Sequence, residues 1–193
     1  MPRFISSDYI DLAPIVRISR FRSAEGHSYA DAVESCRSMK HYFQPRSTAD
    51  WGAVRIFSPV TGVIARTTLE WAGTQLEIQS DAYPAFSVVL FHVNLAAGIG
   101  EGTRLEAGQS IGTHIGSQTT SDVAVRVNST DGVRLVSYFD AVADPVFDQY
   151  RMRGVGSREA LIISRSDRDA NPLTCDGEAF TSRGAIEGWL ALR

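Results

Sequence analysis

The chain has 193 residues, of which 44% are hydrophobic and 21% charged, and its formal net charge is −3 at pH 7. These values are ordinary for a globular protein with one sizeable core, and the mild negative charge offers no basic field for nucleic acid or an anionic membrane. No apolar run reaches the roughly 18 residues of a membrane span, and the N-terminus lacks the charged start and apolar stretch of a signal peptide. We therefore expect one decorated domain, without nucleic acid or a membrane span.

Residues 1–53 combine a short extended segment with a stretch of helical spacing. The run IVRISRF favours a strand. In the following stretch, ADAVESCRSMKHYF, four side chains recur near helical spacing, namely Val33, Cys36, Met39 and Lys40. Pro45 then ends the pattern. We expect an N-terminal segment with a helical insertion.

Residues 54–150 form the clearest structural unit, because apolar and polar residues alternate there at a period of two. The expected strands lie in the runs RIFSPVTGVIAR, TQLEIQS, FSVVLFHVNL, QSIGTHIG, SDVAVRVN and GVRLVSYFD. Pairs such as Ala72-Gly73 and Asp131-Gly132 separate them and are typical of hairpin turns, since glycine adopts positive φ without steric cost. These features predict a β-domain.

Alternation also assigns side chains to faces of the expected sheet. It places His92 on the same face as Leu90 and Val88. In the strand SDVAVRVN the three valines form an inward row, and the opposite row consists of Asp122, Ala124 and Arg126.

Residues 151–193 follow the β-domain as a C-terminal extension that we expect to pack on it. Just before it, after the last expected strand, the run DAVADPVFDQYRMRG (residues 140–154) predicts a short helix with Pro145 near its start and Gly154 at its end. A second helix is expected from Ser157 to just before Pro172.

The two cysteines, Cys36 and Cys175, lie on either side of the β-domain. One disulfide joining the N-terminal insertion to the C-terminal extension and two free thiols are equally compatible with the sequence. No CxxC or Cys/His cluster indicates a cysteine-ligated zinc.

Four motifs in order resemble the lysostaphin-type zinc endopeptidases: IFSPVTGVI, LFHVNL, EGTRLEAGQSIGTHIG and DVAVRVNSTDGVRLVSYFD. The similarity covers roughly residues 15–150. It implies a mainly β fold, a duplicated hybrid motif of β-sandwich or barrel-sandwich type, with short helical additions at both ends. Enzymes of this family are secreted and cut peptide cross-bridges of peptidoglycan, so the resemblance also implies an exported protein of the periplasm or cell surface.

The resemblance implies candidate residues for a zinc site. The family's H-x-x-x-D motif corresponds to His27 and Asp31; the alternative is a surface pair on adjacent helical turns. The family's Y-x-H-L strand end corresponds to the run containing His92, which would assist catalysis as a donor or acid. The alternative for His92 is a strand-end histidine bonded to a backbone carbonyl.

The chain departs from the family at its H-x-H strand, where Asp122 and Ala124 take the two histidine positions. Alanine binds no metal, whereas Asp122 offers an oxygen ligand or a base. A hydrolytic zinc needs three protein ligands and a water. His41 is a candidate replacement ligand, with a place on an amphipathic helix as the alternative, and His114 is expected to be solvated.

Two functions follow from these residues. We favour a catalytically degenerate domain that binds peptidoglycan or a cell-envelope protein. The alternative is an active zinc endopeptidase that acts on peptidoglycan cross-links, with ligands from His27 and Asp31 and one of His41, Asp122 or His92. A carrier domain fits less well, since the only lysine, Lys40, lies outside the β-domain.

Overall fold

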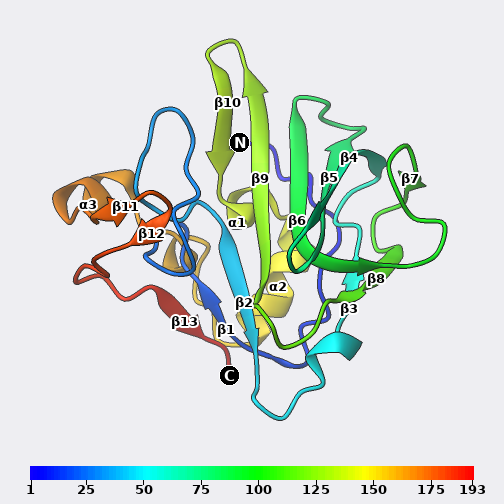
Figure 1. Ribbon diagram of the computed structural model, residues 1–193, viewed down its shortest axis with the longest axis horizontal. Helices are drawn as coiled ribbons and strands as arrows, with labels where there is room; N and C mark the ends of the chain where they lie inside the picture. Colours follow the sequence, from blue (N-terminus) through cyan, green and yellow to red (C-terminus); the bar gives the residue numbers. More distant parts are fainter.

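A computed structural model describes residues 1–193 and contains one large antiparallel sheet (Figure 1). Its strands are β1 (Ile15–Ser19), β2 (His41–Pro45), β3 (Arg55–Phe57), β4 (Gly62–Glu70), β5 (Gly73–Ser80), β6 (Phe86–Leu95), β7 (Arg104–Leu105), β8 (Ser110–His114), β9 (Ser121–Ser129), β10 (Gly132–Val136) and β13 (Trp189–Ala191). Their order is β13-β1-β2-β9-β6-β5-β4-β7; β10 pairs with β9, and β8 pairs with β3 and β6. The expected mainly β fold is confirmed.

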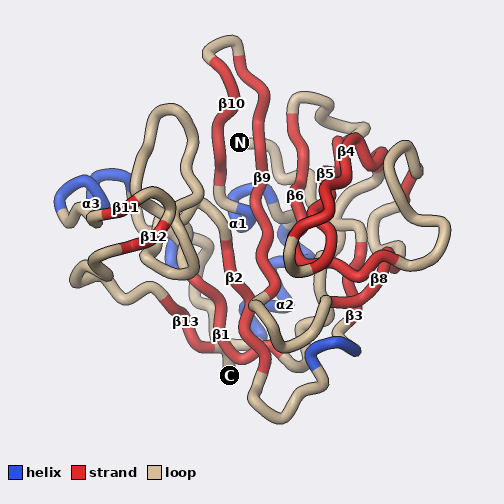
Figure 2. Tube along the Cα trace, viewed as in Figure 1, coloured by secondary structure: helices blue, strands red, loops and turns tan.

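The sheet draws strands from all three parts of the chain. The N-terminal strand β2 pairs with β9 of the central β-region, and β1 and then the C-terminal strand β13 continue the sheet beyond β2 (Figure 2). A separate hairpin, β11 (Cys175–Asp176) with β12 (Ala179–Phe180), lies next to α3 in the C-terminal extension. No helix in the structure is long and apolar enough to cross a membrane.

The helices are α1 (Tyr138–Ala141), α2 (Asp144–Met152) and α3 (Arg165–Ala170), with 3-10 turns at Trp51–Ala53 and Glu159–Leu161. The expected helix containing Pro145 is confirmed as α2, with the proline in its first turn. The helix expected from Ser157 is wrong in extent: α3 begins after Ser164, whose hydroxyl accepts a hydrogen bond from the Asp167 amide and caps the helix.

The helix expected in residues 30–43 is absent, and that prediction was wrong. The segment is an irregular loop that leads into β2. Strand β2 pairs with β1 on one side and β9 on the other, so its backbone groups are bonded within the sheet. Tertiary pairing therefore overrides a helical spacing that rested on four residues.

Apolar side chains cover both faces of the central strands. A core of 31 buried residues, among them Val123 and Val125, fills one side, where α1 and α2 pack. A smaller core on the other side contains Phe21, Met39, Val89, Phe91, Ala124 and Leu135. Val123 and Val125 point into the larger core, as the inward row of valines predicted. Asp122 and Ala124, on the opposite face of the strand, are buried as well. Strand β9 therefore carries a buried carboxyl group.

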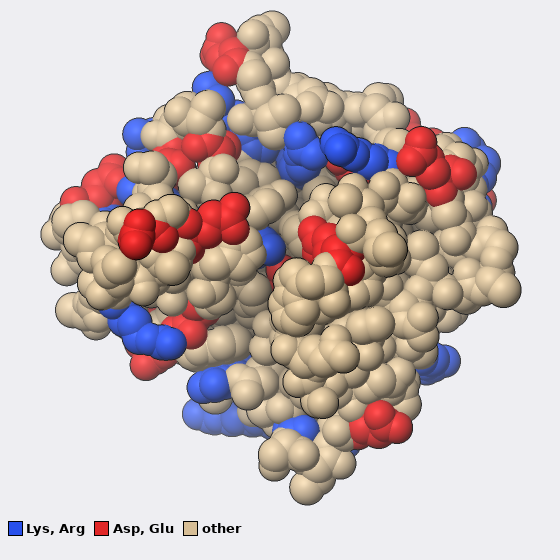
Figure 3. Space-filling model, viewed as in Figure 1, with Lys and Arg blue, Asp and Glu red and all other residues tan.

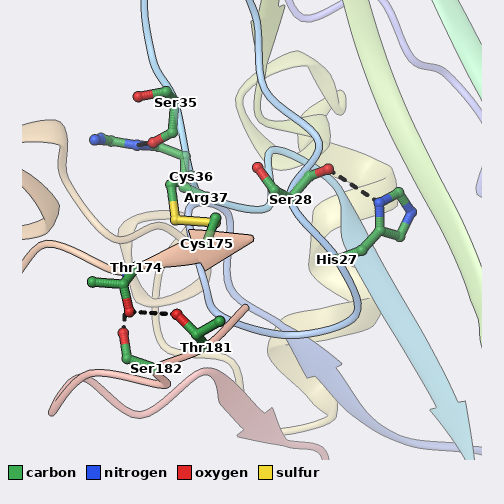
Figure 4. The surroundings of a disulfide bond; sticks show 9 residues. All are labelled: His27, Ser28, Ser35, Cys36, Arg37, Thr174, Cys175, Thr181 and Ser182. Carbon is green, nitrogen blue, oxygen red and sulfur yellow. Dashed lines mark hydrogen bonds between the residues drawn. A yellow bond between two sulfur atoms is a disulfide. The ribbon is translucent and has the colours of Figure 1, made fainter. Parts of the chain in front are cut away.

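Cys36 and Cys175 form a disulfide with a Cα–Cα distance of 5.7 Å (Figure 4). This is one of the two states left open by the sequence. The bond joins the loop before β2 to strand β11 and fixes the C-terminal hairpin beside the loop that carries His27.

Candidate functional site

The position of His92 depends on a bulge in strand β6. Thr74 pairs with Val93 and Leu76 pairs with Leu90, so Phe91 and His92 together face the single residue Gln75. His92 has a φ of 60°, and its ring turns to the same side of the sheet as Phe91 rather than to that of Leu90. The face expected from alternation was therefore wrong for His92. The bulge directs its imidazole into a cleft.

Strand β2 places Lys40 beside Asp122 on that side of the sheet. Tyr42 pairs with Asp122 across the strands, and Lys40 lies two residues before Tyr42, so all three share one face. His41 faces the other way: its Nδ1 lies 2.8 Å from the Ser19 carbonyl oxygen and its Nε2 lies 2.9 Å from the Ser137 hydroxyl.

The Lys40 ammonium lies at the floor of the cleft between two groups expected from sequence to serve a metal. Its Nζ donates to Asp122 Oδ2 at 2.8 Å and lies 3.2 Å from His27 Nε2. It also lies over the rings of Phe91, at 3.8 Å from the centroid, and Tyr29, at 4.6 Å. Lys40 is only 2% exposed. An ion pair, an imidazole and aromatic faces together hold this charge.

The charges of this cluster stabilise one another. Burial raises the pKa of Asp122. The attraction of Lys40, and after it the hydrogen bond and charge of His92, lower this pKa by more than burial raises it, so the net shift is downward. Burial lowers the pKa of Lys40, whereas the attraction of Asp122 raises it, for a net upward shift. The carboxylate and the ammonium therefore both remain charged at neutral pH.

His92 is the second basic side chain that faces Asp122. Its Nε2 lies 3.3 Å from Asp122 Oδ1, and its Nδ1 lies 2.9 Å from the Ala72 carbonyl oxygen. Burial lowers the pKa of His92, but Asp122 and the Ala72 carbonyl raise it more, so the net shift is upward. Since the Ala72 carbonyl is its partner, the alternative interpretation of a strand-end histidine bonded to the backbone is present in the structure. The same ring also touches the cleft.

A tight turn and the C-terminal hairpin position His27. Gly26 has a φ of 67°, and a Cβ there would lie 2.2 Å from the ring of Tyr42, so only glycine fits. The Ser28 amide donates to the Glu178 carbonyl oxygen at 2.8 Å, and the Glu178 carboxylate lies 3.3 Å from His27 Nδ1. The disulfide-linked hairpin therefore forms one wall of the cleft.

The cleft has a volume of about 500 Å³. Its lining residues come from the loop before β2, the β4–β5 hairpin, strand β6 and the C-terminal hairpin: His27, Tyr29, Lys40, Glu70, Trp71, Gln75, Phe91, His92 and Glu178. Trp71, at the tip of the β4–β5 hairpin, is 78% exposed and its ring centroid lies 6.0 Å from that of His92. Figure 3 shows a hollow near the middle of one face with acidic side chains on both sides.

Asp31 lies outside this cluster. Its Oδ1 accepts hydrogen bonds from the amides of Val33 and Glu34, and its Oδ2 accepts one from the amide of Leu135 at 3.0 Å. These contacts fasten the loop to β10. The structure therefore brings together His27, His92 and Asp122, but neither Asp31 nor His41, and it adds Lys40.

His114 is buried, and the expectation of a solvated residue was wrong. It is 1% exposed, its ring stacks on Trp51 with centroids 4.1 Å apart, and burial lowers its pKa to about 4. The 3-10 turn that carries Trp51 covers this end of β8.

The residues present do not fit a catalytic zinc. Such an ion needs three protein ligands and a coordinated water. No group of three or more His, Cys, Asp or Glu side chains is arranged to hold a metal. The point toward which His27 Nε2 and Asp122 Oδ2 converge is taken by the Lys40 ammonium.

Comparison with known proteins supports the fold. No protein-family model matches the sequence, and no curated protein is significantly similar to it. The structure is similar to a chain of the SpoIIQ–SpoIIIAH pore-forming complex, with a TM-score of 0.51 and 12% identity over 77% of this chain and 97% of that one. It is also similar to Csd3 of Helicobacter pylori, with a TM-score of 0.51 and 17% identity over 78% of this chain and 41% of that one.

A weaker likeness, with a TM-score of 0.39 and 14% identity, links it to the catalytic domain of the antimicrobial peptidase lysostaphin from Staphylococcus simulans. It covers 59% of this chain and 94% of that domain. The chain spans less than half of the Csd3 chain, and all these identities are low, so the likenesses concern the fold. The structural likenesses to the SpoIIQ–SpoIIIAH chain and to Csd3 show the fold alone, and the resemblance to lysostaphin-type peptidases rests on the four sequence motifs.

Proposed function

We propose that this chain is a non-hydrolytic, peptidase-like domain whose cleft binds a peptide segment of a cell-envelope protein. The observation that carries the proposal is the Lys40 ammonium, which lies 2.8 Å from Asp122 Oδ2 and 3.2 Å from His27 Nε2. A hydrolytic metal would require that space, and its activated water would need an open position beside it.

The cleft nevertheless keeps features of a binding site. Trp71 presents a large exposed ring at its mouth, and Tyr29 and Phe91 line its interior. Tryptophan and tyrosine supply much of the binding energy at protein interfaces. The carboxylates of Glu70 and Glu178 at the rim favour a basic or amide-rich segment over an acidic one.

Two further observations support a protein partner in an exported setting. A similar chain occurs in the SpoIIQ–SpoIIIAH complex, so this fold takes part in a protein assembly there. The disulfide between Cys36 and Cys175 is a feature of oxidising compartments such as the periplasm or cell surface.

The proposal is tested by measuring turnover and binding with the same preparation. Purified protein is incubated with peptidoglycan, and release of cross-bridge fragments is measured; binding is measured against sacculi and against an array of basic envelope-protein peptides. We expect no turnover, and peptide binding that is lost in Trp71→Ala.

Three results would contradict the proposal. Peptidoglycan turnover that is abolished by His27→Ala and accompanied by about one tightly held zinc per chain would establish the active hydrolase. Binding to sacculi but not to peptides would show that the ligand is a cell-wall component and not a protein. Binding to neither would show that the cleft does not bind either class of ligand.

A further inference from the structure

The β9–β10 hairpin projects from the body of the sheet, and the loop before β2 runs beside its outer strand, β10 (Figure 1). Between them lies a second groove of about 380 Å³, which we call the side groove. It is lined by Tyr29, Ala30, Asp31, Ala32, Arg126, Val133 and Leu135. Five of these seven side chains are hydrophobic, so the side groove suits an apolar side chain.

The two charged residues of the side groove already have partners within the chain. Arg126 Nη1 donates to Glu77 Oε2 at 2.8 Å. Asp31 accepts hydrogen bonds from three backbone amides, one of them that of Leu135. A charged ligand side chain would therefore lose its water without gaining a free ion-pair partner. The side groove favours an uncharged side chain.

Strand β10 also leaves backbone groups free on the edge that faces the loop. Val133 lies opposite Asn128 of β9, but the Asn128 amide donates to the Ala85 carbonyl oxygen on its other side. In an antiparallel ladder such a pair is not hydrogen-bonded, so the amide and carbonyl of Val133 point away from β9. Outside the ladder no hydrogen bond uses this amide, and the carbonyl oxygen has only a contact of 3.4 Å with Arg134 Nη1. A free strand edge of this kind can pair with an extended segment of another chain.

Asp31 and Tyr29 determine where such a segment can lie. The Asp31 carboxylate accepts from the Leu135 amide at 3.0 Å, so an added strand can pair with β10 only from Val133 toward the hairpin tip. Tyr29 lines both the side groove and the cleft, and it is the one residue that they share. Its ring meets the Phe91 ring of the cleft edge to face, with centroids 5.6 Å apart. A peptide that leaves the cleft across Tyr29 therefore enters the side groove.

We propose that the peptide-binding site continues past Tyr29: an extended segment of the partner protein places a basic side chain in the cleft and a nearby aliphatic side chain in the side groove, and its backbone pairs with Val133. The inference rests on the proposed function, because the segment is the same peptide. It adds a requirement that the cleft alone does not make, namely an aliphatic residue near the basic one.

Capped peptides based on serine and threonine test this requirement by isothermal titration. They carry one lysine, one leucine or both, at varied spacing and in both orders. We expect the best peptide with both residues to bind at least about 10-fold more tightly than the same peptide with serine in place of leucine.

Two valines of the chain provide a matched pair of variants. Val133→Asp should abolish the gain from leucine, because it places a charge in the apolar groove. Val33→Asp should keep the gain, since Val33 is exposed on the same loop but does not line the side groove. A gain that survives Val133→Asp, or no gain at any spacing, would overturn the inference.

Hydrogen exchange of single backbone amides tests the strand pairing. The Val133 amide should exchange rapidly in the free chain and at least about 10-fold more slowly when the peptide with both residues is bound. The Leu135 amide already donates to Asp31 and serves as the internal reference, which should not change. A Val133 amide that stays unprotected in the complex would contradict the pairing with β10.

The same peptides separate this inference from the proposed function. Trp71→Ala should weaken the lysine peptide and the peptide with both residues by the same factor, because Trp71 lines only the cleft. Binding of lysine peptides without any gain from leucine would support the cleft and contradict the side groove. Binding of the leucine peptide that depends on Val133, with no binding of lysine peptides, would support the side groove and contradict the proposed function.

Discussion

Two buried aspartates in this chain have opposite properties. Asp8 accepts hydrogen bonds from the Tyr9 amide and from the hydroxyls of Tyr138 and Tyr150. Burial nevertheless raises the pKa of Asp8 to about 6. Asp122 is enclosed even more completely, yet Lys40 and His92 more than offset the effect of burial and lower its pKa. Neutral donors satisfy the geometry of a buried carboxylate, but a cation is needed to favour its charged form.

The difference separates a structural site from a candidate binding site. The Asp8 cluster lies against the aromatic core beside α1 and α2, and its hydroxyl donors join distant segments. The Asp122 cluster lies at the floor of the cleft, next to the exposed Trp71 through His92. The same residue type therefore stabilises the fold in one place and organises a cation site in the other.

The largest expected effect comes from removing the cation beside Asp122. Lys40→Met leaves a buried, unpaired carboxylate, and we expect the free energy of unfolding to fall by about 3–5 kcal/mol at pH 7. Chemical denaturation measures this loss. The double variant with Asp122→Leu should recover most of it, because neither charge is then left buried. Equal loss in the single and double variants would mean that packing, not charge, is responsible.

The disulfide is expected to matter about as much, because it fixes one wall of the cleft. Replacing Cys36 and Cys175, which are 139 residues apart in sequence, by serine opens the loop and should cost about 5 kcal/mol in the chain-entropy model. Hydrogen exchange should increase at the Ser28 amide, which donates to Glu178. Unchanged exchange there would show that the wall is held without the disulfide.

The Asp8 cluster predicts a pH dependence of known sign. Burial raises the pKa of Asp8 in the folded chain to about 6, above its ordinary value of 3.8, so the native chain loses stability as the pH rises from about 4 to 7 and this carboxyl group must ionise while buried. Asp8→Asn carries no such proton. Its stability relative to the native chain should therefore rise by about 3 kcal/mol over this range, as measured by denaturation at several pH values. A constant difference would contradict the raised pKa.

The smallest effect on stability is expected at the cleft mouth. Trp71→Ala should change the free energy of unfolding by less than about 0.5 kcal/mol, since the side chain is mostly solvated. It should weaken peptide binding by about 10-fold or more. Leu69→Ala is the matched control, because Leu69 is 85% exposed on the same hairpin but does not line the cleft. Equal losses in both variants would argue against a specific role for Trp71.

The alternation of residues predicted the central strands well, because the larger core selects every second residue there. Alternation failed at His92, which a bulge turned to the cleft. The helical spacing of residues 30–43 failed as well, because β2 pairs with two neighbouring strands there. Both failures depend on long-range contacts that no local pattern contains.

The site was only partly accessible from sequence. Motif order pointed to His27, His92 and Asp122, which the structure brings together around Lys40. Lys40 itself was considered only as a helical residue and an unsuitable carrier lysine. Two signals in the sequence were available: Lys40 is the only lysine, and it precedes His41 by one residue. Neighbouring residues of an extended segment point to opposite faces, so Lys40 would lie on the face opposite to that of His41.

The most direct test of the buried ion pair between Lys40 and Asp122 is nitrogen-15 NMR of the Lys40 side chain, which gives a single lysine signal without assignment. The account predicts an ammonium group whose protons exchange slowly with water at pH 7, with contacts to the Phe91 ring and a pKa above that of an unperturbed lysine. A rapidly exchanging ammonium with an unshifted pKa and no contact to Phe91 would contradict it.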